Sequence, residues 1–209
     1  MSKYFNFFPN TLYTVDTITG DAVKNITARF SFEESFKNNT SVCYEYNIQD
    51  SDTPEIIASK FYGDPERHWV VLMFNDINDP QFDWPMDYRT LISFVDEKYK
   101  NQANTGQSGS NWAQSHTHGY YKVETRTTLS TNTVVTNKFE VDSNTYATIN
   151  ATNNDILLAD GNTIRIQISK QTQSYYDYEM ELNESKRRIK LLKQEFIPNI
   201  EAEFRRVIA

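Results

Sequence analysis

The sequence is short of cysteine, of glycine and of long apolar runs, and each shortage excludes a class of protein. Cys43 is the single cysteine among 209 residues, which excludes an internal disulfide and a metal site built from several cysteines. The 6 glycines form no phosphate-binding loop. The longest apolar run, residues 69–74, is far too short to cross a bilayer. Because no basic region followed by an apolar core opens the chain, we expect no signal peptide and assembly in a reducing host cytoplasm.

Positive charge is also scarce. The 21 Lys and Arg are outnumbered by 28 Asp and Glu, and the resulting net charge is −7. This balance argues against a nucleic-acid coat or a membrane-surface protein, since both need basic faces. Aromatic residues are abundant at 14%, although only 38% of the residues are hydrophobic. Aromatic side chains are enriched in interface cores, so the composition predicts an elongated protein that buries its rings against neighbouring proteins.

The residues that could carry chemistry form no convergent set. His116 and His118 could seat a metal, but no acidic or cysteine partner lies near them, and solvated histidines in a polar loop are the alternative. Cys43 could act as a nucleophile with a distant histidine. A lone cysteine beside Val42 and Tyr44 is, however, more often a small core residue. We therefore predict neither enzymatic activity nor a cofactor.

The clearest folding signals lie in residues 44–101. Large and polar residues alternate over 44–48, which predicts a short strand. A helix should open at 53–55, where a proline and an acidic residue suit the first turn, and it should end at Gly63.

Two further helices are predicted after Gly63. The first opens at 64–66 and carries the apolar run 69–74, so it should be buried on most sides. The second covers residues 87–100. If the apolar run is core, replacing Trp69 with Ala should destabilise the fold by roughly 3–5 kcal/mol.

These motifs resemble known families. Residues 46–49, 52–54, 57–58 and 61–65 are similar to a LysM repeat, although Ser51 stands where that repeat usually has glycine. A more specific pattern resembles the LysM-like baseplate wedge protein of contractile-tailed, T-even-like phages. Its motifs lie at 62–65, 68–73, 75–76, 79–80 and 83–85. Residues 4–9 and 175–208 also look similar to that family, whereas roughly 102–170 do not.

The resemblance implies a non-catalytic structural subunit of the inner baseplate in the virion tail. It implies partners among other baseplate wedge proteins, of the core-bundle and sheath-initiator types, in multiple copies per baseplate. The chain would clamp such neighbours within and between wedges, with no nucleic acid and no membrane involved. The LysM-like core would consist of Tyr46, Ile48, Ile57, Phe61, Trp69, Leu72 and Trp84.

True LysM modules suggest an alternative function, because they bind N-acetylglucosamine polymers of peptidoglycan. In this chain the corresponding groove would be lined by Asp52, Thr53 and Asn75. Trp84 or Tyr62 could offer a ring on which a sugar stacks. A phage wall hydrolase with such a module normally carries a catalytic domain, and none is visible here. Glycan binding by a phage tail is therefore the alternative to protein–protein assembly.

Both ends of the chain carry rings and aliphatic side chains that need a covering surface. In the N-terminal arm these are Tyr4, Phe5, Phe7 and Phe8. In the C-terminal segment a predicted helix carries a stripe at four-three spacing, formed by Tyr178, Leu182, Ile189, Leu192 and Phe196. Each set either binds a partner or packs on the chain's own domain, and the resemblance favours partners for the arm. We expect deletion of residues 1–42 to leave the middle domain folded and to abolish assembly.

The remaining residues complete an α+β fold. Small polar residues over 102–118 predict a flexible loop. Thr and Val are frequent over 119–170, and Asp-Gly at 160–161 separates two apolar runs. This pattern predicts a small antiparallel insertion of roughly four to six strands, one of them at 146–149. The predicted parts are an extended N-terminal arm (1–42), a LysM-like domain (43–101), a flexible loop (102–118), a β insertion (119–170) and a C-terminal helical segment (171–209).

Overall fold

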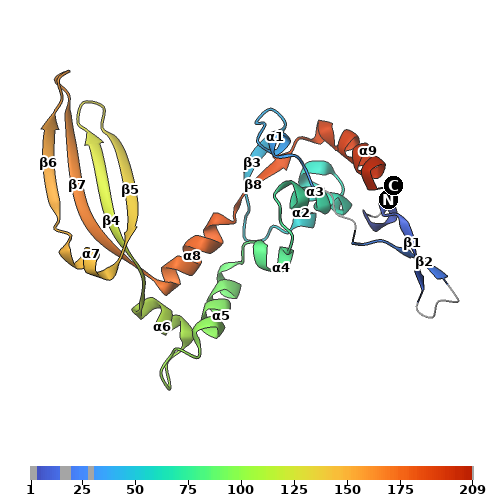
Figure 1. Cartoon of the computed structure of the whole chain (residues 1–209), viewed down its shortest axis with the longest axis horizontal. Coiled ribbons are helices and arrows are strands. Elements are labelled where there is room, and N and C mark those ends of the chain that lie inside the picture. The colour runs from blue at the N-terminus through green and yellow to red at the C-terminus, as the bar shows by residue number, and fades with distance from the viewer. Residues whose placement is uncertain (1–3, 15–19, 28–30, 209) are drawn as a thin grey trace. The chain divides into compact units, whose positions relative to one another are not determined.

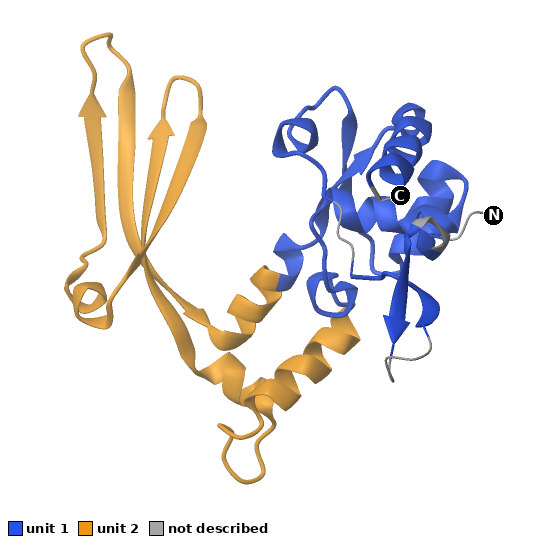
Figure 2. Cartoon of the chain, turned by 45° about the vertical axis from the view of Figure 1, so that its right-hand side comes forward, with its two compact units in different colours: residues 1–87, 183–209 blue, residues 88–182 orange. Residues whose placement is uncertain are grey.

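The chain divides into two units. The structure is a computed structural model that describes residues 4–14, 20–27 and 31–208, and for residues 6, 7 and 208 it describes the backbone only. Unit 1 comprises Met1–Asp87 and Asn183–Ala209, and unit 2 comprises Tyr88–Leu182 (Figure 2). Unit 2 is therefore inserted into unit 1 along the sequence.

Short helices and small antiparallel sheets build unit 1 (Figure 1). Its N-terminal part contains the 3-10 helix η1 (Tyr4–Phe7), β1 (Asn10–Thr14), β2 (Gly20–Lys24), α1 (Glu34–Lys37), β3 (Cys43–Asn47), α2 (Pro54–Tyr62), the 3-10 helix η2 (Pro65–Arg67), α3 (His68–Phe74) and α4 (Pro80–Asp83). Its C-terminal part contains β8 (Arg188–Leu192), the 3-10 helix η3 (Gln194–Phe196) and α9 (Ile197–Ile208). Strand β1 pairs with β2, and β3 pairs with β8.

Local sequence signals fix the ends of α2 and the start of the next helix. The Thr53 hydroxyl accepts a backbone hydrogen bond at 3.3 Å, and Pro54 occupies the first turn. Gly63 ends α2 in the left-handed region, with φ of 70°. Asp64 then caps η2. The predicted starts of both helices and the stop at Gly63 are confirmed, and the third predicted helix is α5 (Tyr88–Tyr99) of unit 2.

Strand β8 overturns the prediction of one long C-terminal helix. The segment instead contains α8 (Tyr175–Ser185), then β8, η3 and α9, and β8 pairs antiparallel with β3 along its whole length. Ile189 and Leu191 are buried, whereas Lys190 between them is only half-buried, which is the period of a strand. The helical spacing is therefore wrong here, because residues 188–192 hydrogen-bond to a partner strand that lies far away in the sequence.

The core of unit 1 draws on both ends of the chain. Phe8 and Phe32 from the N-terminal part and Ile197 and Phe204 from the C-terminal part belong to one buried cluster with α2, α3 and β8. Deletion of residues 1–42 would remove buried side chains from this cluster and leave cavities. Contrary to the expectation from the sequence, we therefore expect that deletion to destabilise unit 1.

Helices and one antiparallel sheet build unit 2 (Figure 1). Its further elements are α6 (Gly109–Ser115), β4 (Thr117–Thr128), β5 (Thr133–Val141), α7 (Ser143–Thr148), β6 (Thr152–Leu157) and β7 (Thr163–Ser174). The strand order is β5-β4-β7-β6, and every neighbouring pair is antiparallel. Helix α8 follows β7, and its last three residues belong to unit 1. Together the units confirm a mixed α+β chain with antiparallel sheets.

The antiparallel insertion expected over 119–170 is confirmed, whereas two local predictions for unit 2 are wrong. The strand expected at 146–149 falls largely in α7, because Asp142 caps a helix through two backbone N–H groups. The loop expected at 102–118 contains α6, which Ser108 caps by accepting a hydrogen bond from the Asn111 N–H. The expected turn at 160–162 is present, with Gly161 at a φ of 83°.

An aromatic cluster joins α5, α6 and α8. The ring of Tyr99 lies 5.6 Å from Trp112 and 5.4 Å from Tyr175, measured between centroids. The carboxylate of Glu179 is buried and accepts bonds from the Tyr99 hydroxyl (2.7 Å) and from Lys98 Nζ (2.6 Å). Burial, aided by the negative charge of Glu179, raises the pKa of Tyr99. Trp112 is thus packed locally.

Candidate assembly interface

The loop between β3 and α2 is organised around the carboxylate of Asp52, which is 4% exposed. This carboxylate accepts hydrogen bonds from the Tyr46 hydroxyl (2.6 Å) and the Gln49 N–H (3.1 Å). The ammonium of Lys60 also donates to it at 2.6 Å. Burial alone would raise the pKa of Asp52, but these donors outweigh burial and hold that pKa below its usual value. Burial and the bond to Asp52 raise the pKa of Tyr46 to about 12.

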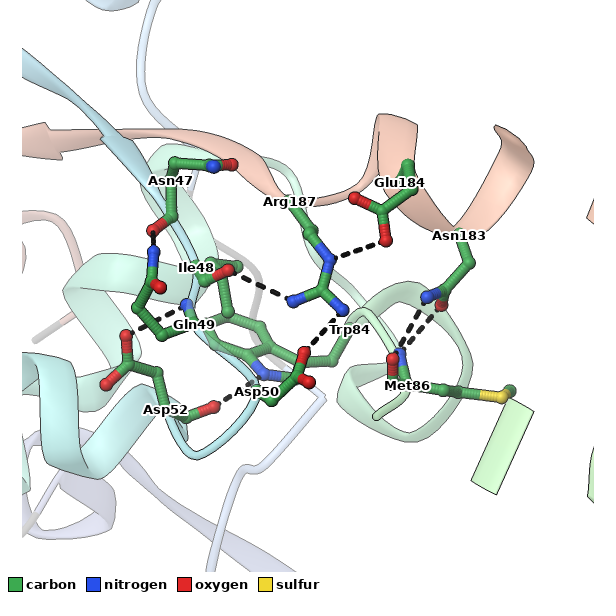
Figure 3. Close-up of polar contacts among 10 residues, drawn as sticks. All are labelled: Asn47, Ile48, Gln49, Asp50, Asp52, Trp84, Met86, Asn183, Glu184 and Arg187. Atoms are coloured by element: carbon green, nitrogen blue, oxygen red, sulfur yellow. Dashed lines mark hydrogen bonds and ion pairs between the residues drawn. The ribbon is translucent and has the colours of Figure 1, made fainter. Parts of the chain in front are cut away.

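Trp84 and Arg187 fix the same loop through further contacts (Figure 3). The indole N–H of Trp84 donates to the Asp52 carbonyl at 3.0 Å. The guanidinium of Arg187 donates to the Ile48 carbonyl at 3.1 Å and forms an ion pair with Asp50 at 2.6 Å. Two segments far apart in sequence therefore hold the loop in one conformation, so it offers a rigid surface rather than an adaptable one.

Asn183 links the two places where the chain leaves and re-enters unit 1. Its side-chain amide donates to the Met86 carbonyl at 3.0 Å, and its Oδ1 accepts from the Met86 N–H at 2.7 Å (Figure 3). Such a reciprocal pair resembles the bonds exchanged by paired residues of a β ladder. It holds residues 86 and 183 side by side.

Asn75 forms a similar reciprocal pair of hydrogen bonds with the backbone of β8. Its amide donates to the Lys190 carbonyl at 2.8 Å, and its Oδ1 accepts from the Lys190 N–H at 2.7 Å. The amide also donates to the Val71 carbonyl at 2.8 Å. The end of α3 is thereby fastened to a strand from the C-terminal part of the chain.

These contacts occupy the groups that a glycan would need. Asp52 and Asn75 bond to the chain itself as just described, and the Thr53 hydroxyl caps α2. Tyr62 is buried at 2% exposure and offers no ring to a sugar. A pocket of about 350 Å³ lies beside Asn75, but among its described lining residues there is no aromatic ring. The glycan-binding alternative is therefore not favoured.

The aromatic residues at the start of the chain divide between core and surface. The ring of Tyr4 stacks on Phe204 at 5.5 Å, and Phe8 is buried at 4% exposure. Phe5 is 58% exposed. The side chain of Phe7 lies outside the described residues. Tyr4 and Phe8 thus pack on their own unit, and partner contact by the exposed Phe5 stays a prediction.

The residues of the predicted C-terminal stripe do not share one helix face. Tyr178 is half-buried in unit 2, and Leu182 at the end of that unit is 43% exposed. Ile189 and Leu192 are buried in the core of unit 1, and Phe196 packs against that core. Partner contact by this stripe stays a prediction, and Leu182 has the most exposed side chain for it.

The residues expected to form a LysM-like core lie in unit 1. Ile48, Ile57 and Trp69 are buried, and the ring of Trp69 stacks on Phe204 at 4.7 Å. The partly buried members of the set are Tyr46, Phe61, Leu72 and Trp84.

The β1–β2 hairpin is a surface that the sequence reasoning did not single out. Every residue of both strands is exposed, and Leu12 and Tyr13 reach 77% and 60%. Adjacent strand residues point to opposite faces, so each face of the hairpin presents a large apolar side chain. The adjacent large apolar side chains of Leu12 and Tyr13 were the available signal.

Comparison with known proteins identifies the family. A family model described as "Base plate wedge protein 53" matches residues 3–207. The chain belongs to this family. "Baseplate wedge protein gp53" of Enterobacteria phage T4 is 39% identical over 56 residues, which are 27% of this chain and 29% of that relative. The alignment thus spans less than a third of the relative, whereas the family match includes both the β1–β2 hairpin and the sheet of unit 2.

Membership in the base plate wedge protein 53 family supports a structural role in the phage tail base plate and contact with other base plate proteins. The residues weighed for chemistry have local packing partners. His116 stacks on Trp112 at 4.2 Å, His118 stacks on Tyr178 at 3.9 Å, and Cys43 packs against the core of unit 1. Within the described ranges, no group of His, Cys, Asp and Glu could hold a metal ion. None of the described helices has the length and hydropathy to cross a membrane.

Proposed function

We propose that this chain clamps neighbouring wedge proteins in the phage tail base plate, both within one wedge and between adjacent wedges. The family match over residues 3–207 supports the location. The observation that carries the clamp is the β1–β2 hairpin, whose strands are exposed along their whole length. By resemblance, the partners are wedge proteins of the core-bundle and sheath-initiator types, and assembly takes place in the host cytoplasm.

The hairpin has the properties of a segment that a partner covers. Leu12 faces Ala22 on one face, and Tyr13 and Val23 share the other. An isolated two-stranded hairpin with apolar side chains on both faces is marginally stable in water. Among the described strands, β1 and β2 pair only with each other, so each offers an edge to which a neighbouring protein can add a strand. We assign both functions, covering the faces and pairing the edge, to one neighbouring wedge protein.

The base of the hairpin is tied to unit 1. Lys24 Nζ donates to the Phe8 carbonyl at 2.8 Å, and the Asn25 N–H donates to the Pro9 carbonyl at 2.9 Å. Phe8 is itself buried in the core. A pull on the hairpin is therefore transmitted to the folded unit, which a clamp requires.

The order β3, α2, α3, β8 in unit 1 supports the LysM-like character of this docking module. A strand, two helices and a second strand that pairs antiparallel with the first occur in this order, with α4 and unit 2 between α3 and β8. The second strand comes from residues 188–192 rather than from the residues directly after α3. A module stabilised in this way keeps its shape when several surfaces bind partners at once. Several modest contacts together hold an assembly more tightly than any single contact does.

The experiment is co-purification of the full chain with the other base plate wedge proteins encoded by the same phage. Replacing Leu12 with Asp puts a charge on the most exposed apolar side chain of the hairpin and should weaken the complex at least about tenfold. Phe82→Asp is the control, because Phe82 is 57% exposed elsewhere on unit 1. Normal assembly of the Leu12 variant would contradict the clamp.

A parallel pull-down with peptidoglycan separates the two functions. We expect no retention of the chain on peptidoglycan. Retention without any complex with wedge proteins would overturn the proposal in favour of glycan binding.

A further inference from the structure

One face of the sheet in unit 2 is rich in apolar side chains. The pairing defines this face, since Arg126 of β4 lies opposite Val135 of β5 and Ile166 of β7. Alternation along each strand then assigns every second residue to it. Its main apolar members are Val135, Phe139, Ile156, Ile164, Ile166 and Ile168. We call this surface the isoleucine face.

Half of these apolar side chains of the isoleucine face are exposed. Val135, Phe139 and Ile156 are 50%, 49% and 46% exposed, whereas Ile164, Ile166 and Ile168 of the central strand β7 are half-buried. At one end, α7 packs its Tyr146 ring against Tyr120 at 4.9 Å. An exposed apolar surface of this kind on a folded protein marks an interaction site.

The isoleucine face is also positively charged, although the whole chain has a net charge of −7. The register places Lys122, Arg126 and Lys170 on it, against a single carboxylate, Glu124. Glu124 pairs with Arg126 at 2.7 Å. The opposite face is balanced instead, since its two cations face two carboxylates: Lys138, Arg165, Glu140 and Asp155. The excess of positive charge is thus confined to the isoleucine face.

We propose that the isoleucine face docks another base plate protein whose contact surface combines apolar side chains with Asp or Glu. The inference rests on the proposed function and adds a second contact surface to it. Strand spacing and rise give the face about 19 by 33 Å, or roughly 600 Å². One partner contributes about 800 Å² to a standard interface. The isoleucine face is therefore large enough to supply most of one partner's contribution. A second copy is disfavoured as occupant, because face-to-face contact would bring cations against cations.

The test uses two neighbouring residues of one strand. Val135 and Val134 are both Val, are 50% and 58% exposed, and point to opposite faces. Val135→Asp should weaken binding of the full chain to the purified wedge proteins of the same phage at least tenfold. Val134→Asp should bind like the parent chain. Lys122→Glu and Lys138→Glu form a second pair, in which only Lys122→Glu should weaken binding, and more strongly at low salt.

The outcomes separate this inference from the proposed function. Circular dichroism and thermal unfolding first establish that the variants are folded. Equal binding by Val135→Asp and Val134→Asp, together with loss of binding by Leu12→Asp, would overturn the isoleucine face and leave the hairpin clamp standing. Failure of the parent chain to bind any wedge protein would overturn both. A concentration-dependent dimer that only Val135→Asp abolishes would assign the face to a second copy instead.

Discussion

At the scale of single residues, unit 1 depends on polar side chains that bond to backbone far away in the sequence. Asn75 holds Lys190, Asn183 holds Met86, and Arg187 holds the Ile48 carbonyl. Nothing in the composition around these residues distinguishes them from solvated polar residues. The buried aromatic and aliphatic residues, by contrast, could be predicted, because apolar runs such as 69–74 indicate burial by themselves.

Replacing Trp69 tests whether the apolar run 69–74 belongs to the core of unit 1. Trp69 is 6% exposed, and its ring packs against those of Tyr4 and Phe204 at 5.5 and 4.7 Å. Trp69→Ala should lower the free energy of unfolding of unit 1 by about 3–5 kcal/mol, through lost transfer energy and a residual cavity. Urea unfolding measures the change, and Phe82→Ala at a 57% exposed ring is the control. Equal midpoints for both variants would show that α3 is not core.

Replacing Asp52 tests the polar contacts of unit 1 through the pH dependence of its stability. The folded pKa of Asp52 lies below the usual value, so its ionised form stabilises the fold above the unfolded pKa of about 3.9. That contribution is lost as the pH falls through the folded pKa. Asp52→Asn should therefore lower stability at neutral pH and flatten its decline below about pH 4. Urea unfolding between pH 3 and 7 measures both effects.

Tyr46→Phe refines this test because it keeps the carboxylate and removes one donor. It should raise the pKa of Asp52 toward its unfolded value, so the acid-induced loss of stability should be smaller and should be complete at a higher pH than in the parent chain. If the free energy of unfolding of the parent chain and of Asp52→Asn changed in parallel with pH, Asp52 would be excluded as a source of the pH dependence of stability.

At the scale of elements, the sequence predicts structure where local interactions decide it and fails where distant partners do. Helix α2 could be placed because Thr53, Pro54 and Gly63 act within the helix itself. Strand β8 could not, since its hydrogen bonds go to β3, and its apolar residues also fit a helical spacing. The hairpin was missed for a related reason: the sequence does not show that its two strands are exposed along their whole length.

Asn75→Ala tests how far β8 depends on α3. The change leaves the backbone N–H and carbonyl of Lys190 without their side-chain partner, which should cost about 2–3 kcal/mol. Amide hydrogen exchange should accelerate in β8 and β3 more than in α2. Asn78→Ala is the matched control, since Asn78 is exposed and bonds only within its own loop. Unchanged exchange in β8 would mean that pairing with β3 alone fixes the strand.

At the scale of the whole molecule, unit 1 is built from two stretches that are not contiguous in the sequence. Residues 88–182 separate α3 and α4 from β8 and α9 in sequence, yet all four belong to unit 1. The family resemblance found the middle of this unit, and the predicted boundaries at 43 and 101 followed the motifs. The actual unit adds both termini, because Phe8, Ile197 and Phe204 complete its core.

Excision of unit 2 tests this organisation directly. The bonds between Asn183 and Met86 hold residues 86 and 183 side by side, so a Gly-Ser linker of about four residues, which spans up to ~13 Å, can join residue 87 to residue 183. The excised chain should unfold cooperatively, because β8 and α9 remain. It should also keep the contact that depends on Leu12.

Truncation after residue 182 should instead leave unit 1 unfolded, since it removes β8 and the buried Ile197 and Phe204. Circular dichroism during urea unfolding distinguishes the two chains. An unfolded excised chain would mean that unit 1 needs unit 2 for its stability, and the isoleucine face would then belong to a single cooperative fold rather than to a separate docking unit.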